Sequence, residues 1–441
     1  MTECNSESLT FSSLSRKKII ADFGGGHLTS DAGALLLREA NRRTGLIDAL
    51  AACISDPRDP ARIQHDVKTL LAQRVFGIAM GYEDGNDHQS LRNDPIMQLL
   101  AETAPDPEEP LASPSTLCRF ENWVNRKSLA RMSEVLVDQF IASHRTPPKE
   151  IILDFDATDD RIHGDQEGSF FHAFYYHYCY LPLYVFCGDQ LLVAYLRPSK
   201  IDAAKHSRGI LKLLVRRIRE SWPRVRIIFR ADSGFCRWKT LKYCDENAIG
   251  YVVGLATNAR LKRIQQPFMD AAEQRFEATG EKQRSFHEFA YSAKTWDRKR
   301  RVILKAERLP KGANPRFVVT NLDDSPKAIY DAIYTQRGEM ENRIKEQQLY
   351  LFADRTSCSK FIANQFRLLL ASAAYVLIEH VRREGLKDTE LAEARVDTIR
   401  LKLLKVAARV VVSVRRVVLH LSSSYPYQSL LHRLVARLAP S

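Results

Sequence analysis

Residues Ile151–Asp165 read IILDFDATDDRIHGD, an apolar run that becomes acidic within a few positions. Because side chains alternate between the two faces of a strand, Leu153 and Phe155 point to one face, and Asp154 and Asp156 to the other. Five aspartates lie between Asp154 and the end of this stretch, in a chain with 66 Lys and Arg against 53 Asp and Glu. Such an acidic pocket in a basic protein suits a divalent cation that acts on a phosphate backbone. The alternative is a solvated acidic turn after a strand.

The composition of the whole chain limits what the protein can be. Its 441 residues suggest about three domains. An apolar fraction of 45% supplies buried cores and excludes global disorder. The net charge of +13 favours an anionic partner, most simply nucleic acid.

Cysteine use and hydropathy indicate where the protein works. The eight cysteines form no Cys-x-x-Cys pair, so we expect reduced thiols in a cytosolic protein and no zinc site. The N-terminus is polar and carries no secretory signal. The longest apolar stretch, Leu368–Ile378, is too short to cross a bilayer, so we expect a buried helix and no membrane association.

The predicted elements divide the chain into five segments. Residues 1–148 read as mostly helical, and 149–257 as a mixed α/β layer. Residues 258–318 are polar and look like a small β-rich insertion, whereas 319–385 return to a core strand and two helices. Residues 386–441 form a basic C-terminal region whose function the sequence does not indicate.

Basic residues follow the Pro-rich break at Ala104–Pro114 in the first segment. These residues are Arg119, Arg126, Lys127 and Arg131. They could lie along DNA or form a solvated surface.

The α/β layer contains a second strand that ends in an aspartate. Ile227–Asp232 reads IIFRAD, and the order of elements allows this strand to lie beside Ile151–Ala157. Between the two lie the aromatic stretch Phe170–Cys187, enough for one or two strands, and a further strand at Gln190–Leu196. Two strand-end aspartates would then meet at one edge of the sheet.

A later helix offers a third carboxylate. At 100° per residue, five polar or aromatic side chains of this helix share one face: Tyr334, Arg337, Glu341, Lys345 and Gln348. Glu339 is about 200° away from Glu341, so the two cannot face the same pocket. The alternative is a solvated face with salt bridges.

These motifs, taken together, resemble a known family. LDFDATDD, HGDQEG, YCYLPLYVF, FRADSGF and YTQRGEMEN are similar to the DDE transposases of bacterial insertion sequences, especially insertion-sequence group 1380 within the wider group 4 superfamily. The resemblance covers nearly the whole chain. It implies an α/β protein with a ribonuclease-H-like catalytic core split between 149–257 and 319–385, a β-rich insertion at 258–318, and a helical DNA-binding region at 1–148.

The resemblance also implies roles for individual residues. The catalytic, metal-binding acids are then Asp156, Asp232 and Glu341, with Asp154 orienting the site from beside the first of them. Tyr334 and Arg337 would contact DNA phosphate. The family expects a lysine seven residues after the glutamate, where this chain has Gln348, and Lys345 on the same face can take its place.

One aromatic residue of the insertion is a candidate for binding the DNA end. Related enzymes hold a flipped base on an aromatic side chain of this insertion, and Trp296 is its sole tryptophan. The alternative is a tryptophan packed within the insertion.

The implied reaction is metal-dependent cleavage at the ends of an insertion sequence and strand transfer into target DNA. Two Mg²⁺ ions, replaceable by Mn²⁺, would stabilise the attacking and leaving oxygens. The partners are then double-stranded DNA, both terminal inverted repeats and target, and a second copy of the chain, because two ends must be held together. The protein would act in the bacterial cytoplasm, on the nucleoid.

Other functions are compatible with the same residues. A nuclease without strand transfer and a domesticated DNA-binding protein remain alternatives, although the intact acids argue against the latter. A zinc or iron site is disfavoured, because the nearby histidines match no standard ligand spacing: His163, His172, His177 and His206.

Overall fold

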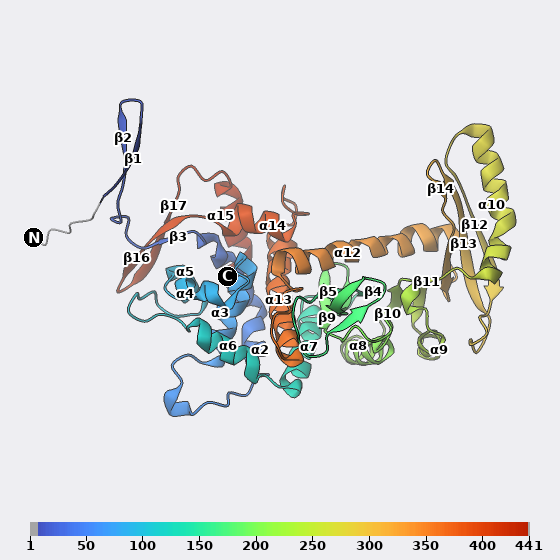
Figure 1. Cartoon of the computed structure of the whole chain (residues 1–441), viewed down its shortest axis with the longest axis horizontal. Coiled ribbons are helices and arrows are strands. Elements are labelled where there is room, and N and C mark those ends of the chain that lie inside the picture. Colours follow the sequence, from blue (N-terminus) through green and yellow to red (C-terminus); the bar gives the residue numbers. More distant parts are fainter. Residues whose placement is uncertain (1–7, 440–441) are drawn as a thin grey trace, which may run out of the picture. The chain divides into compact units, whose positions relative to one another are not determined.

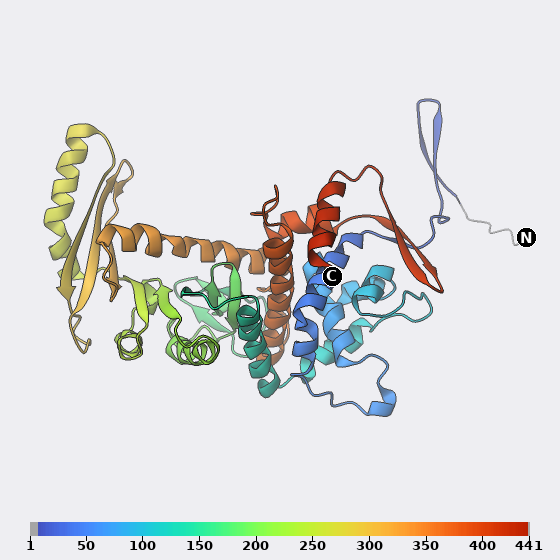
Figure 2. The ribbon, with the colours of Figure 1, turned by 180° about the vertical axis from the view of Figure 1, so that it is seen from behind.

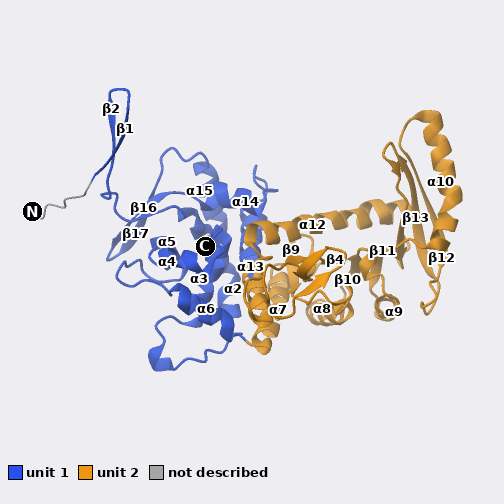
Figure 3. Ribbon diagram, in the orientation of Figure 1, with its two compact units in different colours: residues 1–124, 373–441 blue, residues 125–372 orange. Residues whose placement is uncertain are grey.

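The computed structural model describes residues 8–439, and the chain forms two compact units (Figure 3). Unit 1 consists of residues 1–124 and 373–441, and unit 2 of residues 125–372. The chain passes from unit 2 back to unit 1 within one continuous helix, α13 (Phe361–His380). The first and last segments of the described chain therefore belong to the same unit.

Unit 2 is built on a nine-stranded mixed sheet (Figure 1). Eight of its strands follow the order β12 (Gln283–Tyr291), β13 (Arg300–Leu309), β15 (Arg316–Thr320), β11 (Gly250–Leu255), β10 (Arg226–Ala231), β4 (Glu150–Ala157), β8 (Leu183–Cys187) and β9 (Gln190–Tyr195), and β14 (Gly312–Ala313) pairs with β13. Strands β4, β10 and β11 are parallel neighbours, and the other pairings are antiparallel.

The two aspartate-bearing strands are direct neighbours, as the sequence predicts. Strand β10 pairs in parallel with β4, and the register runs from Arg226 opposite Glu150 to Ala231 opposite Phe155. In a parallel pair both strands end at the same edge of the sheet, so the residues that follow them meet there.

Alternating side chains of these strands feed two hydrophobic layers. Ile227 and Phe229 of β10 belong to the larger core, and Ile228 between them belongs to a smaller core that includes Ile329 and Tyr330. Helices α7 (Arg126–Ala142), α8 (Ser207–Ser221) and α9 (Trp238–Glu246) contribute to the larger core. Figure 1 shows α8 and α9 on one side of the sheet and the helix labelled α12 on the other.

The helix on the second face runs over residues 326–350, which confirms the predicted helix there. It consists of α11 (Pro326–Ala328), a π-helical turn (Ile329–Tyr334), a 3-10 turn (Thr335–Arg337), α12 (Gly338–Lys345) and a second π-helical turn (Glu346–Tyr350). π-Helical turns inside α-helices are frequent at functional sites.

The predicted β-rich insertion is more than a set of strands. Residues 258–318 begin with α10 (Ala259–Thr279), a 21-residue helix that was not predicted from the sequence. The following strands do not form a separate sheet, because β13 pairs with β15 and so extends the central sheet.

The stretch Phe170–Cys187 also differs from its prediction. It forms three strands, of which β6 (Phe170–His172) and β7 (His177–Tyr180) belong to a small sheet with β5 (Asp160–Arg161).

Unit 1 combines helices from the N-terminal part with the C-terminal segment (Figure 2). Its helices are α1 (Leu35–Thr44), α2 (Leu46–Ala51), α3 (Val67–Met80), α4 (His88–Leu91), α5 (Pro95–Leu100), α6 (Pro114–Trp123), α14 (Val396–Ile399) and α15 (Gln428–Leu438). Its strands are the hairpin β1 (Leu9–Leu14) and β2 (Lys17–Ala21), and the sheet of β3 (Leu28–Thr29), β16 (Ala408–Ser413) and β17 (Arg416–Leu421). The pairing of β3 with β16 joins the C-terminal segment to the start of the chain.

One segment has the length and composition of a membrane span. Phe361–Gly385 is long and apolar enough to cross a bilayer, but 78% of its most apolar window is buried inside the protein. This burial is typical of a core helix, which is what the sequence predicts for Leu368–Ile378.

Candidate active site

The three predicted acids come from three elements of unit 2. Asp156 lies on β4, Asp232 follows β10 directly, and Glu341 lies on α12. The Asp232 carboxylate accepts a hydrogen bond from the backbone N–H of Gly234 at 2.8 Å. The register that pairs Phe155 with Ala231 makes Asp156 and Asp232 the next residues along the two strands. The sheet edge therefore brings two carboxylates together beneath the helix that carries the third.

Arg337 connects two of these acids. Its guanidinium donates to Asp156 at 3.2 Å and to Glu341 at 2.9 Å. Burial raises the pKa of Asp156 to about 7, with Arg337 lowering it and the Asp232 and Glu341 carboxylates raising it further. The pKa of Arg337 is itself raised, because the carboxylates outweigh the effect of its burial. Arg337 thus joins Asp156 and Glu341 through ion pairs, and the Asp232 carboxylate contributes to the raised pKa of Asp156.

Asp154 has a different role from its neighbour on the strand. Its carboxylate is buried and forms a two-pronged ion pair with Arg230 of β10, with one bond of 2.6 Å. Arg230 also donates to the backbone carbonyl of Ile333 at 2.5 Å. The pair thus fastens β4, β10 and the helix to one another. Asp154 is thus engaged by Arg230, whereas Asp156 is the carboxylate of β4 that Arg337 contacts.

Tyr334 packs against the turn that carries Asp232. A Cβ placed on Gly254 of β11 would lie 2.6 Å from the Tyr334 hydroxyl and 2.8 Å from the backbone nitrogen of Ser233. Burial raises the pKa of Tyr334, and Arg337 lowers it. Sequence reasoning did not single out Gly254, since an isolated glycine within a strand indicates close backbone approach without naming the partner.

Lys345 and Gln348 lie in different environments on the same helix. Lys345 is exposed. Gln348 donates to the Asp160 carboxylate at 2.9 Å and to the Asp159 carbonyl at 3.0 Å. Burial raises the pKa of Asp160 well above its usual range. The Gln348 amide therefore donates its hydrogen bond to a buried acid. Gln348, at the position where the family expects lysine, thus forms hydrogen bonds to the acidic turn after β4.

Trp296 is half-buried between β12 and β13. Its ring meets Tyr291 edge-on with centroids 5.6 Å apart, and the Arg300 guanidinium lies 5.6 Å from its centre. It also packs on the larger core. Trp296 is therefore packed against neighbouring side chains of residues 258–318.

The remaining candidates near the acids are engaged in local contacts. His177 forms a 2.7 Å contact with Asp159. Glu339 is exposed and accepts from Asn342 at 3.4 Å. Among residues 8–439, no group of three His, Cys, Asp or Glu side chains is arranged to hold a metal ion as it stands. Around the predicted acids, the Arg337 guanidinium supplies positive charge between two of the carboxylates.

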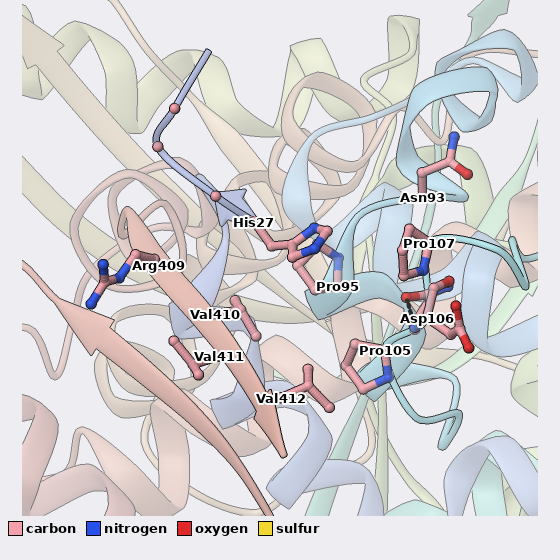
Figure 4. A pocket seen from close by; sticks show the side chains of 14 residues that line it. His27, Asn93, Pro95, Pro105, Asp106, Pro107, Arg409, Val410, Val411 and Val412 are labelled. Carbon is pink, nitrogen blue, oxygen red and sulfur yellow. Dashed lines mark hydrogen bonds between the residues drawn. The ribbon is translucent and has the colours of Figure 1, made fainter. Parts of the chain in front are cut away.

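Unit 1 contains a cavity of about 470 Å³, shown in Figure 4, and none of these acids lines it. It is lined by Gly24–His27, Asn93, Pro95, Gln98, Pro105–Pro107 and Arg409–Val412. Asp106 supplies its one carboxylate, so this cavity offers no ligand set like that of unit 2.

Comparison with known proteins identifies the family. Residues 11–441 match the family described as transposase DDE domain group 1. The chain belongs to the DDE transposase family. A solved structure with similarity to this transposase is a cryo-EM structure of the piggyBac transposase synaptic complex with hairpin DNA. It shares 10% identity at a TM-score of 0.43, over 94% of this chain and 86% of that one. No curated protein matches the chain.

The close approach at Gly254 gives a first prediction for this transposase. Gly254→Ala should push the Tyr334 hydroxyl and the Ser233 backbone apart, because its Cβ would lie less than 3 Å from both. A displacement of this size moves Asp232 and should lower the cleavage rate roughly a hundredfold. The control is Gly209→Ala on α8, where an added Cβ meets nothing within 4 Å. A Gly254→Ala enzyme with the wild-type rate would contradict this role.

The raised pKa of Asp156 gives a second prediction, for stability without divalent cations. Between its usual pKa of 3.8 and about 7, the folded state keeps a proton that the unfolded state has lost. Raising the pH through this window therefore lowers the free energy of unfolding, by up to roughly 4 kcal/mol at about 1.4 kcal/mol per pKa unit. Denaturant titrations of Asp156→Asn should show a smaller fall than wild type, because the parts due to Asp160 and other buried acids remain, whereas Glu339→Gln should keep the whole fall. If the free energy of unfolding of Asp156→Asn fell by as much as that of wild type, groups other than Asp156 would be responsible for the fall.

Proposed function

We propose that this transposase cleaves DNA at the ends of a bacterial insertion sequence and transfers the cleaved strand into target DNA. The observation that carries this proposal is the meeting of Asp156, Asp232 and Glu341 with Arg337 at one edge of the sheet. Carboxylates bind the cations that in-line displacement at phosphorus requires. The basic balance of the chain suits a polyanionic substrate.

The arrangement of strands supports a ribonuclease-H-like core within unit 2. Strands β4, β8 and β9 form an antiparallel meander, and β10 and β11 follow in parallel on the other side of β4. This order, with acids on the first and fourth strands, agrees with the core expected at 149–257. The catalytic glutamate then comes from the segment 319–385. Insertion-sequence group 1380 remains the proposed subgroup, on the motifs of the sequence.

The residues at the site fit a divalent cation by their chemistry. All three candidates are oxygen donors, which Mg²⁺ and Mn²⁺ prefer. The Asp156 side chain is largely buried and Glu341 is 47% exposed, so the glutamate has room to move toward the aspartates. Asp156, Asp232 and Glu341 would hold two Mg²⁺ ions, which when bound stabilise the attacking and leaving oxygens.

The other residues of the site position the DNA. Tyr334 and Arg337 are proposed to contact the phosphate next to the scissile bond, once Arg337 has left its carboxylate partners. Lys345, exposed one helical turn after Glu341, can reach a neighbouring phosphate. Trp296 remains a candidate for contact with the DNA end. The transposase is proposed to act as a dimer on DNA, since two ends must be joined together, in the bacterial cytoplasm.

A reaction on the flanking DNA tests the proposal. A plasmid with the gene and both flanks is incubated with the transposase and Mg²⁺, and breaks and new junctions are sequenced. We expect breaks at inverted repeats on each side and junctions between those ends and target DNA. Breaks without junctions would favour the nuclease, and binding without breaks would favour a domesticated DNA-binding protein.

The proposed contact between the N-terminal region and DNA gives a third prediction. Arg119 on α6 and Lys127 on α7 are exposed, as are the other two basic residues singled out there. If each contacts a phosphate, replacing either by Ala should weaken binding of an end duplex and reduce its salt slope by about one. Lys311→Ala, exposed in the turn before β14, is the control. Unchanged salt slopes in both variants would remove these residues from the DNA-binding surface.

A further inference from the structure

A hairpin beside the acids is unusually rich in exposed aromatic side chains. Strands β6 (Phe170–His172) and β7 (His177–Tyr180) pair so that Phe171 lies opposite Tyr178, and residues 173–176 form the turn. We call residues 170–180, which read FFHAFYYHYCY, the aromatic hairpin. Tyr176 in the turn adopts a positive φ of 60°, which costs energy for a residue of this size.

One face of the aromatic hairpin is fixed next to the acids. His177 contacts Asp159 at 2.7 Å, and the Tyr175 ring lies 5.0 Å from His172 and 6.1 Å from His177. The pKa of Tyr175 is raised to about 12, first by burial and then by the carboxylates of Asp159, Asp156 and Asp232. The His177 contact thus fixes the hairpin beside the acidic turn that follows Asp156 on β4.

The opposite face and the tip of the hairpin are uncovered. Phe174 and Tyr176 are each 84% exposed, and Phe171 and Tyr178 are 50% and 55% exposed. Phe171 meets Tyr176 and Tyr178 edge-on at 5.6 and 5.8 Å, so these rings hold one another in place. A contiguous group of exposed apolar side chains on a folded protein marks an interaction site.

The composition of the aromatic hairpin points to nucleotide bases as the occupant. Residues 170–180 contain no carboxylate, and the Lys200 ammonium lies 5.3 Å from the Phe170 ring centre. Flat aromatic faces beside a cation suit bases and their phosphates. Bases within a duplex already stack on one another, so the rings can take only unpaired or flipped ones.

We propose that the aromatic hairpin stacks unpaired bases of the DNA strand whose phosphate lies at the three acids. This inference rests on the proposed function and assigns to Phe174 and Tyr176 the base-holding role that the sequence analysis gave to Trp296. The rings at the tip flank Tyr175 in the hairpin, whose His177 contacts Asp159, three residues after Asp156. Bases leaving the duplex at the cleavage point meet them first.

A binding measurement on the full chain tests this proposal. The Asp156→Asn background prevents cleavage, and the probe is a duplex of about 20 base pairs with a tail of four unpaired nucleotides, one of them 2-aminopurine. We expect its fluorescence to be quenched on binding. Phe174→Ala combined with Tyr176→Ala should remove the quenching and weaken tailed-duplex binding about five- to a hundredfold per stacked base. Affinity for the blunt duplex should stay unchanged, and Phe174→Trp should keep the quenching.

Control variants separate stacking from other causes. Leu213→Ala removes another exposed apolar side chain, on α8, and should leave both affinities unchanged. If Trp296→Ala removes the quenching and the double variant does not, the base site lies in the insertion. Equal loss for tailed and blunt probes, or a double variant that changes only self-association or vesicle binding, would overturn the proposal. Because the readout is binding, a wild-type protein that quenches the probe but does not cleave would refute the proposed function alone.

Discussion

Glu341→Gln is expected to abolish Mg²⁺-dependent cleavage while leaving DNA affinity unchanged. The substitution keeps the shape of the side chain and its acceptor oxygen toward Arg337, but it removes the charge that would bind the cation. Cations contribute several kcal/mol to transition-state stabilisation, so the rate should fall at least about a thousandfold. The measurement is nicking of an end duplex, with affinity determined separately in Ca²⁺.

Glu339 is the matched control for this substitution. It lies two residues earlier on the same helix, is exposed, and accepts a hydrogen bond from Asn342. Glu339→Gln should therefore keep activity within a few-fold of wild type. Asp156→Asn and Asp232→Asn should behave as Glu341→Gln does. Loss in Glu339→Gln with retention in Glu341→Gln would place the third acid on the other face of the helix.

Asp154→Asn should cause the largest loss of stability among single substitutions at the site. It would leave the Arg230 guanidinium, whose side chain is only 8% exposed, without its carboxylate partner. Breaking one side of a buried ion pair costs about 3–5 kcal/mol. Thermal and denaturant unfolding would measure this loss. Replacing both partners with apolar residues, Asp154→Leu with Arg230→Met, should recover much of it.

The same two strands supply a control for this prediction. Glu150 and Arg226 form an ion pair of 3.0 Å at the start of β4 and β10, with side chains 38% and 54% exposed. Exposed pairs contribute about 0–1 kcal/mol, so Glu150→Gln should be nearly neutral. Equal effects of Asp154→Asn and Glu150→Gln would show that the buried pair does not hold the strands together.

The sequence was sufficient to predict the main parts of the candidate site. Apolar strands that end in Asp156 and Asp232 predicted neighbouring strands, and the structure confirms that they are neighbours and shows that they pair in parallel. Helical periodicity placed Arg337 and Glu341 on one face, where they form an ion pair. The helix prediction rests on local periodicity, and the strand prediction on alternation within each strand and on the order of the elements.

Contacts between particular side chains of distant segments could not be predicted from periodicity or from the order of the elements. The Asp154–Arg230 pair depends on the register between two strands, and the approach of Tyr334 to Gly254 depends on how the helix lies over the sheet. Helix α10 was overlooked because it is largely polar and contains Pro267, a residue that usually ends a helix.

Burial is the other property that pattern alone did not supply. The aromatic residues of Phe170–Cys187 read as core strands, yet Phe174 and Tyr176 are among the most exposed large hydrophobic side chains of the described residues. Likewise, no signal in the sequence shows that the C-terminal segment completes unit 1 by pairing β16 with β3. Both features concern which surface an element covers, and this is settled by tertiary packing.

The central claim is that Asp156, Asp232 and Glu341 together hold the catalytic cations. Crystals of the transposase soaked in Mn²⁺ test it most directly, because anomalous scattering locates the ion without reference to activity. We predict an anomalous peak bounded by these three carboxylates, with the Arg337 guanidinium moved away from Asp156. A peak at the Asp159 and Asp160 turn, or no peak near Asp156 at a saturating Mn²⁺ concentration, would contradict the account.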